Sequence, residues 1–180
     1  MSRRDELVAA ATDYVLEHGL VGMSLRPLAE ALGTSDRMLL YHFGTKDDLV
    51  TSILRASNDR SVSQIRSLPP ARGVRRAVLD LWAAMTSSTI DPCCRLYVEA
   101  SALGLLGREP YAGVVRDLNR DWMAALADHL VAAGVARGKA GRIAALVDST
   151  MMGLFLDRPL EEPGQQRRTV EDLATAAATV

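Results

Sequence analysis

The sequence predicts an all-α protein in which a small N-terminal helix-turn-helix precedes a larger helical bundle. Apolar residues recur at helical spacing along almost the whole chain, and no segment shows the sustained alternation of a β-strand. Glycine and proline interrupt this pattern at intervals that are typical of helix ends. With 180 residues, of which 48% are hydrophobic and 24% charged, the chain has the composition of an ordinary folded protein.

The first helix is expected over residues 3–18. Leu7, Ala11 and Val15 recur at spacings of four and form its inner face. Gly19 follows directly, and glycine can end a helix in the left-handed conformation that other residues avoid. We therefore expect the first helix to end at Gly19.

A second and a third helix are expected on either side of a glycine turn. Ser24 can cap the second helix, which Gly33 closes. The hydroxyl of Thr34 or Ser35 can cap a short third helix that ends near His42. Two helices joined by such a turn form a helix-turn-helix, the motif that places its second helix in the major groove of DNA.

Longer helices are expected beyond this motif. A fourth helix should begin at Gly44 or Thr45 and continue to about residue 67. Pro69 and Pro70 then break the pattern, because consecutive prolines cannot continue a helix. Five further helices are expected at about residues 73–88, 92–106, 109–133, 138–156 and 166–178.

The charge balance gives no support of its own for nucleic-acid binding. The net charge is −1. Residues 1–48 contain five basic side chains (Arg3, Arg4, Arg26, Arg37, Lys46) and eight acidic ones (Asp5, Glu6, Asp13, Glu17, Glu30, Asp36, Asp47, Asp48). Because charges act mainly within a Debye length of about 8–10 Å, a DNA-binding function would depend on where the basic groups lie.

Several other classes of protein are disfavoured. No apolar run approaches the roughly 18–20 residues of a membrane span, and the first residues do not read as a signal peptide. The only cysteines, Cys93 and Cys94, are adjacent, which favours a reducing cytoplasm and buried, inert thiols over a disulfide framework or a sensor. Without a nucleophile elbow, a phosphate-binding glycine loop or metal-ligand spacing, we expect no catalytic residues, no metal and no cofactor.

A continuous pattern of apolar, glycine and polar positions runs through residues 5–50. It consists of Leu7-Val8, Ala10-Ala11, Gly19-Leu20, Ser24-Leu25, Leu28-Ala29, Leu32-Gly33-Thr34-Ser35, Leu39, His42-Phe43 and Lys46-Asp47-Asp48-Leu49. This pattern resembles the N-terminal domain of the TetR family of bacterial transcriptional regulators, with the spacing preserved. The rest of the chain shares only the family's general helical layout.

The resemblance implies a homodimer with two reading heads on a palindromic operator of double-stranded DNA. We accordingly divide the chain into a helix-turn-helix DNA-binding domain, residues 1–48, and an effector-binding and dimerisation domain, residues 49–180. Binding of a small-molecule effector would release the DNA, and family members usually repress. The alternative is a DNA-binding adaptor whose C-terminal domain binds a partner protein and no small molecule.

Two positions depart from the family's pattern. The family commonly has a tyrosine directly after the residue at Leu39, and its hydroxyl contacts a phosphate; here Leu40 occupies that position and Tyr41 follows. Whether Tyr41 replaces this contact stays open. The turn usually reads Gly-Val-Ser, whereas here Thr34, which nearly matches valine in shape, occupies its middle position.

Nine residues are candidates for contact with DNA. Arg37 lies early on the third helix, where its guanidinium can donate two parallel hydrogen bonds to guanine; a solvated arginine or a partner of Asp36 is the alternative. Asp36 can accept from cytosine or orient Arg37, and Met38 can touch a thymine methyl or pack inward. The remaining candidates, expected to hold the phosphate backbone or to cap helices, are Ser24, Arg26, Ser35, Tyr41, His42 and Lys46.

A modest apolar effector is expected to bind the C-terminal domain. Pockets for small molecules are mostly apolar, and only 4% of the chain is aromatic, which leaves few stacking partners for a flat multi-ring ligand. The candidate lining residues, each of which can equally be plain core, are Trp82, Met85, Tyr97, Trp122, Met123 and Met151.

The last two helices are expected to form the dimer interface, and packing within its own domain is the alternative for the final, less apolar helix. Their apolar face includes the small residues Ala144 and Gly153. Its larger members are Ile143, Leu146, Val147, Thr150, Met151, Leu154 and Phe155. Such a face must be covered, and the family covers it with the second copy of the chain.

Overall fold

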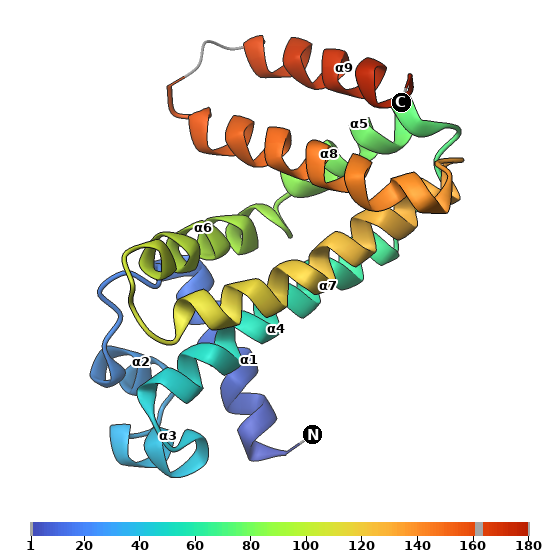
Figure 1. Cartoon of the computed structure of the whole chain (residues 1–180). Helices are drawn as coiled ribbons and strands as arrows, with labels where there is room; N and C mark the ends of the chain where they lie inside the picture. The colour runs from blue at the N-terminus through green and yellow to red at the C-terminus, as the bar shows by residue number, and fades with distance from the viewer. Residues whose placement is uncertain (1, 161–163, 180) are drawn as a thin grey trace. The chain divides into compact units, whose positions relative to one another are not determined.

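The structure of the protein, a computed structural model, describes residues 2–160 and 164–179. Within these ranges all regular structure is α-helical (Figure 1), so the all-α prediction is confirmed. The helices are α1 (Arg3–His18), α2 (Leu25–Ala31), α3 (Asp36–Phe43), α4 (Lys46–Arg66), α5 (Val74–Met85), α6 (Asp91–Leu105), α7 (Tyr111–Ala132), α8 (Arg137–Asp157) and α9 (Gln165–Ala177). None of them, in the part of the chain described, is long and apolar enough to cross a membrane.

The helices pack as two compact units. The first comprises Met1–Ser61 and Ser88–Asn119, and the second comprises Val62–Ser87 and Arg120–Val180. These units describe packing, so the functional division after residue 48 stays a prediction. They do show that the helix-turn-helix shares its unit with α6 and with the first turns of α7.

One apolar core holds the first unit together. The predicted inner face of α1 is buried, and Leu28 of α2 and Leu39 of α3 are completely buried against it. Leu96 and Ala100 of α6 belong to the same core. The other buried members are Leu7, Ala11, Val15, Leu20, Met23, Ala29, Phe43, Leu49, Val50, Ile53, Leu54, Val114 and Leu118.

The helix ends follow the sequence signals with two corrections. Ser35 caps α3 by accepting from Met38 N at 3.3 Å, and Thr45 Oγ1 accepts from Asp48 N at the start of α4. Ser24 occupies the N-cap position of α2, but its side chain makes no capping hydrogen bond, so its predicted role as a cap is wrong. Gly19 ends α1 with φ 85° and ψ 167°, a positive φ that suits glycine but not the left-handed helical conformation.

In the second unit, α9 packs along α5 and α8 (Figure 1). Trp122 Nε1 on α7 donates to Asp148 Oδ1 on α8 at 2.7 Å. Most of the expected dimer face of α8, including Val147 and Met151, is already buried within the single chain. The prediction that these buried residues of α8 form the dimer interface therefore needs correction. Helical periodicity identifies the apolar positions, but it does not show whether they are covered by the same chain or by a second copy. Leu146 is the member that stays exposed, at 49%.

Candidate DNA-binding site

The turn between α2 and α3 has a defined hydrogen-bond pattern that orients the two helices. Thr34 N donates to Ala29 O at 2.9 Å, and Gly33 N donates to Glu30 O at 3.1 Å. This pair is the Schellman arrangement, which satisfies the last carbonyls of a helix and needs a positive φ at its glycine. Gly33 has φ 63°, so a side chain at this position would be strained.

Helix α3 has one buried and one exposed face. Leu39 and Phe43 point into the core. Arg37 and Tyr41, one helical turn apart, lie near the middle of the opposite face, since residues four apart share a side of a helix. Tyr41 is 78% exposed, and Met38 beside them is exposed rather than packed inward. This face therefore exposes the guanidinium of Arg37, the phenol of Tyr41 and the apolar side chain of Met38, all of which could contact a DNA groove.

The residues expected to contact the phosphate backbone of DNA differ in their interactions within the protein. Arg26 pairs with Glu30 at 3.4 Å, and both side chains are largely exposed. Lys46 Nζ donates to the backbone carbonyl of Met23, which ties the start of α4 to the segment before α2. His42 packs edge-to-face against Tyr41, with ring centroids 5.3 Å apart. Ser24 and Asp36 are exposed, and the hydroxyl of Ser35 accepts the capping hydrogen bond from Met38 N.

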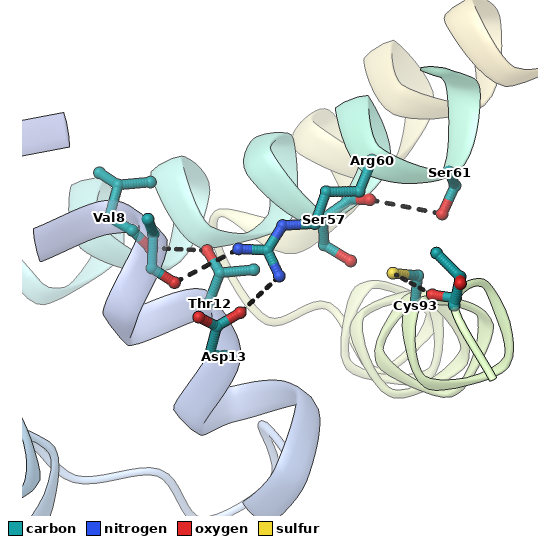
Figure 2. Close-up of polar contacts among 9 residues, drawn as sticks. Val8, Thr12, Asp13, Ser57, Arg60, Ser61 and Cys93 are labelled. Carbon is teal, nitrogen blue, oxygen red and sulfur yellow. Dashed lines mark hydrogen bonds and ion pairs between the residues drawn. The ribbon is translucent and has the colours of Figure 1, made fainter. Parts of the chain in front are cut away.

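Two acidic side chains of the N-terminal segment are paired with arginines, and one of these arginines, Arg60, lies outside residues 1–48. Glu6 pairs with Arg3 at 3.0 Å, and Asp13 with Arg60 of α4 at 2.6 Å (Figure 2). Each of these exposed pairs stabilises the fold by little, but Arg60 adds a positive charge that the count for residues 1–48 does not include. Arg4 lies over the ring of Phe43, 5.0 Å from its centroid, so one of the five basic groups of residues 1–48 lies beside α3.

Sequence reasoning missed a positioning residue of this unit, Glu99 on α6. Its Oε2 accepts hydrogen bonds from the backbone N–H groups of Leu20 and Val21, at 2.7 and 2.8 Å. A Cβ at Gly19 would lie 3.3 Å from Glu99 Oε1, so this close approach also favours glycine. The only signal in the sequence is an acidic residue on the apolar face of α6 that carries Leu96 and Ala100.

The candidate effector residues are divided between the two units. Tyr97 belongs to the first unit and is partly buried. In the second unit Met85, Trp122 and Met151 are buried, and Trp82 and Met123 are partly buried; all five belong to that unit. Burial of this kind suits core and ligand contacts alike, so the assignment stays a prediction.

Cys93 and Cys94 are both buried, as the sequence predicted. Within the described residues, no group of three or more histidine, cysteine, aspartate or glutamate side chains is arranged to hold a metal ion. The titratable groups with shifted pKa values lie elsewhere. In the second unit, burial raises the pKa of Asp148, and the hydrogen bond from Trp122 opposes this shift. Burial also lowers the pKa of His129.

The raised pKa of Asp148 predicts a pH-dependent stability. A carboxyl whose pKa is higher in the folded state stabilises the fold below its unfolded pKa of about 3.9, and this contribution is lost as the pH rises through the folded pKa. Asp148→Asn keeps an acceptor for Trp122 and cannot ionise. We expect the variant to match wild type below about pH 4 and to be more stable near neutrality, as measured by urea unfolding across this range. Asp128→Asn, an exposed change on α7, is the control; a pH-independent difference for Asp148→Asn would contradict the assignment.

Comparison with known proteins agrees with this geometry. Residues 7–53 match the family model of bacterial regulatory proteins of the tetR family. The HTH-type transcriptional repressor KstR2 of Rhodococcus jostii (strain RHA1) is 30% identical over 89 residues, which are 49% of this chain and 44% of KstR2. The chain thus aligns with less than half the length of this curated relative.

Solved structures match almost the entire chain. The transcriptional regulator SCO7518 of Streptomyces coelicolor A3(2) is 27% identical, with a TM-score of 0.73 over 99% of this chain and 100% of its own. BioQ, solved with its natural double-stranded DNA operator, is 19% identical, with a TM-score of 0.63 over 100% of both chains. Together with the glycine-closed turn and the exposed face of α3, these matches show that residues 7–53 form a helix-turn-helix domain like that of the bacterial tetR-family regulators, and that the chain has the fold of SCO7518.

Proposed function

We propose that the chain is a ligand-responsive repressor that binds a palindromic operator as a homodimer and is released by a small-molecule effector. The observation that carries this proposal is α3, whose buried Leu39 and Phe43 anchor a face that presents Arg37, Met38 and Tyr41 to solvent. To contact bases in the major groove, a recognition helix must expose one face and be fixed to the rest of the domain by its other face. The proposed repressor acts in the cytoplasm, because it must reach operator DNA there.

The proposed contacts divide by chemistry. Arg37 reads guanine, since its guanidinium matches the two acceptors on the edge of that base. Met38 contacts a thymine methyl, which its outward orientation supports. Tyr41 and Arg26 hold the phosphate backbone, and Ser24 joins them because its hydroxyl is not used as a cap. Asp36 orients Arg37 or accepts from a cytosine amino group.

Loss of Arg37 should affect specific binding selectively. We expect Arg37→Ala to weaken operator binding by about 1–3 kcal/mol and to relax the preference at one position of each half-site. Lys46→Ala should instead weaken binding to all sequences alike, and Arg66→Ala, an exposed change at the far end of α4, should leave binding unchanged. Fluorescence anisotropy on operator and random duplexes measures both effects. Equal losses on the two duplexes for Arg37→Ala would contradict its role as a base reader.

The proposed homodimer is supported by the face of α8 that the single chain leaves uncovered. Leu146 and Leu156 are 49% and 52% exposed, and the small residues Ala145 and Gly153 lie near them along the helix. Exposed apolar surface interspersed with small residues allows a second copy to approach closely. Sedimentation at micromolar protein should give a dimer. A strict monomer would contradict both the interface and the palindromic operator.

The proposed effector has an apolar body of modest size. The six candidate lining residues supply tryptophan, tyrosine and methionine side chains, of which methionine adapts readily to ligand shape. A thermal-shift screen against metabolites tests this part of the proposal. Any compound that raises the melting temperature should also lower operator affinity in the same buffer.

A further inference from the structure

The first turn of α1 is held by a capping box, so the basic residues there lie on an ordered helix. Ser2 Oγ accepts from Asp5 N at 3.2 Å, and Asp5 Oδ2 accepts from Ser2 N at 2.9 Å. These reciprocal bonds satisfy two N–H groups that the helix itself leaves without a partner. Arg3 and Arg4 therefore occupy defined positions on the first turn of α1.

The two arginines have different partners. Arg3 Nη1 lies 3.0 Å from Glu6 Oε2, so a carboxylate compensates its charge. Arg4 instead lies over the ring of Phe43, and its Nη2 donates to Ser52 Oγ at 3.2 Å. Both partners of Arg4 are uncharged, and no carboxylate of the described residues is bonded to it. The charge of Arg4 is thus oriented by its neighbours without being neutralised.

The contacts of Arg4 leave part of its guanidinium available to a ligand. The Phe43 ring lies against the face of the group, whereas the N–H groups point outward in its plane. Ser52 Oγ donates to Asp48 O at 2.8 Å, which leaves its oxygen to accept from Arg4. The remaining N–H groups can bind two oxygens of one phosphate in parallel. Because the ring and the hydroxyl already orient the side chain, binding costs it less conformational entropy.

This guanidinium lies beside the residues that are expected to contact DNA. Phe43 ends α3 directly after His42, and Lys46 begins α4. Ser52 follows Lys46 by six residues, or about 9 Å along the axis of α4. Figure 1 shows that α1 begins at the end of the first unit where α3 lies. Arg4 therefore extends the positive surface from α3 and α4 to the start of α1.

We propose that Arg4 binds a phosphate of the DNA backbone beside the groove that α3 occupies, with one such contact for each copy of the chain. The inference rests on the proposed function, because it adds a contact from α1 to those of α2, α3 and α4. A phosphate contact increases the affinity for every sequence and carries no base preference. The alternative is a purely structural arginine that joins α1 to α3 and α4.

The salt dependence of DNA binding separates these two roles. Each phosphate that a protein neutralises makes the slope of log K against log salt concentration steeper by about 0.9. We expect Arg4→Ala to make this slope shallower by about 2 for a homodimer with one contact from each copy. The change should be equal on the operator selected from random DNA and on a random duplex. A purely structural role would lower the affinity but leave the slope unchanged.

Three further variants make this test specific to the charge at position 4. Arg4→Gln keeps a donor for Ser52 and removes the charge, so it should reproduce the shallower slope even if Arg4→Ala folds poorly. Arg4→Lys keeps the charge and should keep most of the wild-type slope. Arg3→Ala removes the same charge from the neighbouring residue, where Glu6 already compensates it, and should leave the slope near that of wild type. An equal change for Arg3→Ala would show a general charge effect and overturn the contact.

Neutral phosphate analogues test the contact directly. Operator duplexes carry one methylphosphonate at successive backbone positions, and fluorescence anisotropy measures their binding. Wild type should lose affinity when the phosphate bound by Arg4 is neutralised, and Arg4→Ala should show no further loss at that position. If every methylphosphonate weakens the two proteins equally, Arg4 binds no phosphate.

DNA binding by the wild-type chain distinguishes failure of this inference from failure of the proposed function. A chain that binds its operator, with the same salt slope in wild type, Arg4→Ala and Arg4→Gln, would overturn only the Arg4 contact. A chain that binds no DNA would overturn the proposed repressor function and the contact together.

Discussion

Replacing Leu39 with alanine should lower the free energy of unfolding by about 2–5 kcal/mol, the usual range for a buried leucine. Leu39 is completely buried in the core that joins α3 to α1 and α2. Its truncation removes apolar contacts and leaves a cavity that the surrounding helices fill only in part. Urea unfolding followed by circular dichroism measures the loss.

The adjacent residue supplies the control for this experiment. Leu40 is 39% exposed on the same helix, so Leu40→Ala should change stability by about 0.5 kcal/mol or less. Leu39→Ala should also weaken operator binding, because α3 depends on Leu39 for its orientation. Equal stability of the two variants would mean that α3 is not anchored by the core described above.

Replacing Glu99 with alanine should lower the free energy of unfolding by about 2–3 kcal/mol and reduce operator affinity. One carboxylate oxygen of Glu99 accepts from both Leu20 N and Val21 N. A hydrogen bond to a charged group contributes about 1.5–3 kcal/mol, and we assign most of the expected loss to the partly buried bond from Leu20, because the bond from Val21 is exposed. The removal would leave the partly buried N–H of Leu20 without this acceptor. Since these residues connect α1 to α2, the helix-turn-helix would lose part of its positioning.

Two further variants make the role of Glu99 specific. Glu99→Gln retains an oxygen that can accept both N–H groups, so it should recover part of the stability and of the operator affinity. Glu17→Ala, which removes an exposed glutamate of α1, should have little effect on either. If Glu99→Ala behaves like Glu17→Ala, the contact between α6 and the α1–α2 connection does not position the reading head.

The sequence predicts those features that depend on neighbouring residues. Gly33 and Ser35 mark the turn because a positive φ and a capping hydroxyl are local requirements, and the structure confirms both. Ser24 shows the limit of this reasoning, since a residue can occupy a cap position without making the capping bond. The residue type alone does not show which hydrogen bond a serine side chain makes.

Contacts between residues far apart in the sequence could not be predicted. Glu99 lies 79 residues from Leu20 along the chain, and no local pattern links them. The arginine–aspartate pair of Arg60 and Asp13 joins α4 to α1 in the same way. For α8, the periodicity gave the apolar positions correctly, but burial of Val147 inside the chain depends on packing in three dimensions.

Selection of bound duplexes from random DNA tests the central claim most directly. We expect a palindromic consensus with two equivalent half-sites, because the proposed twofold-symmetric dimer presents two copies of α3 to the duplex. The same selection with Arg37→Ala should lose the preference at one position in each half-site. No enriched sequence, or a single asymmetric site, would contradict binding of a palindromic operator by a homodimer.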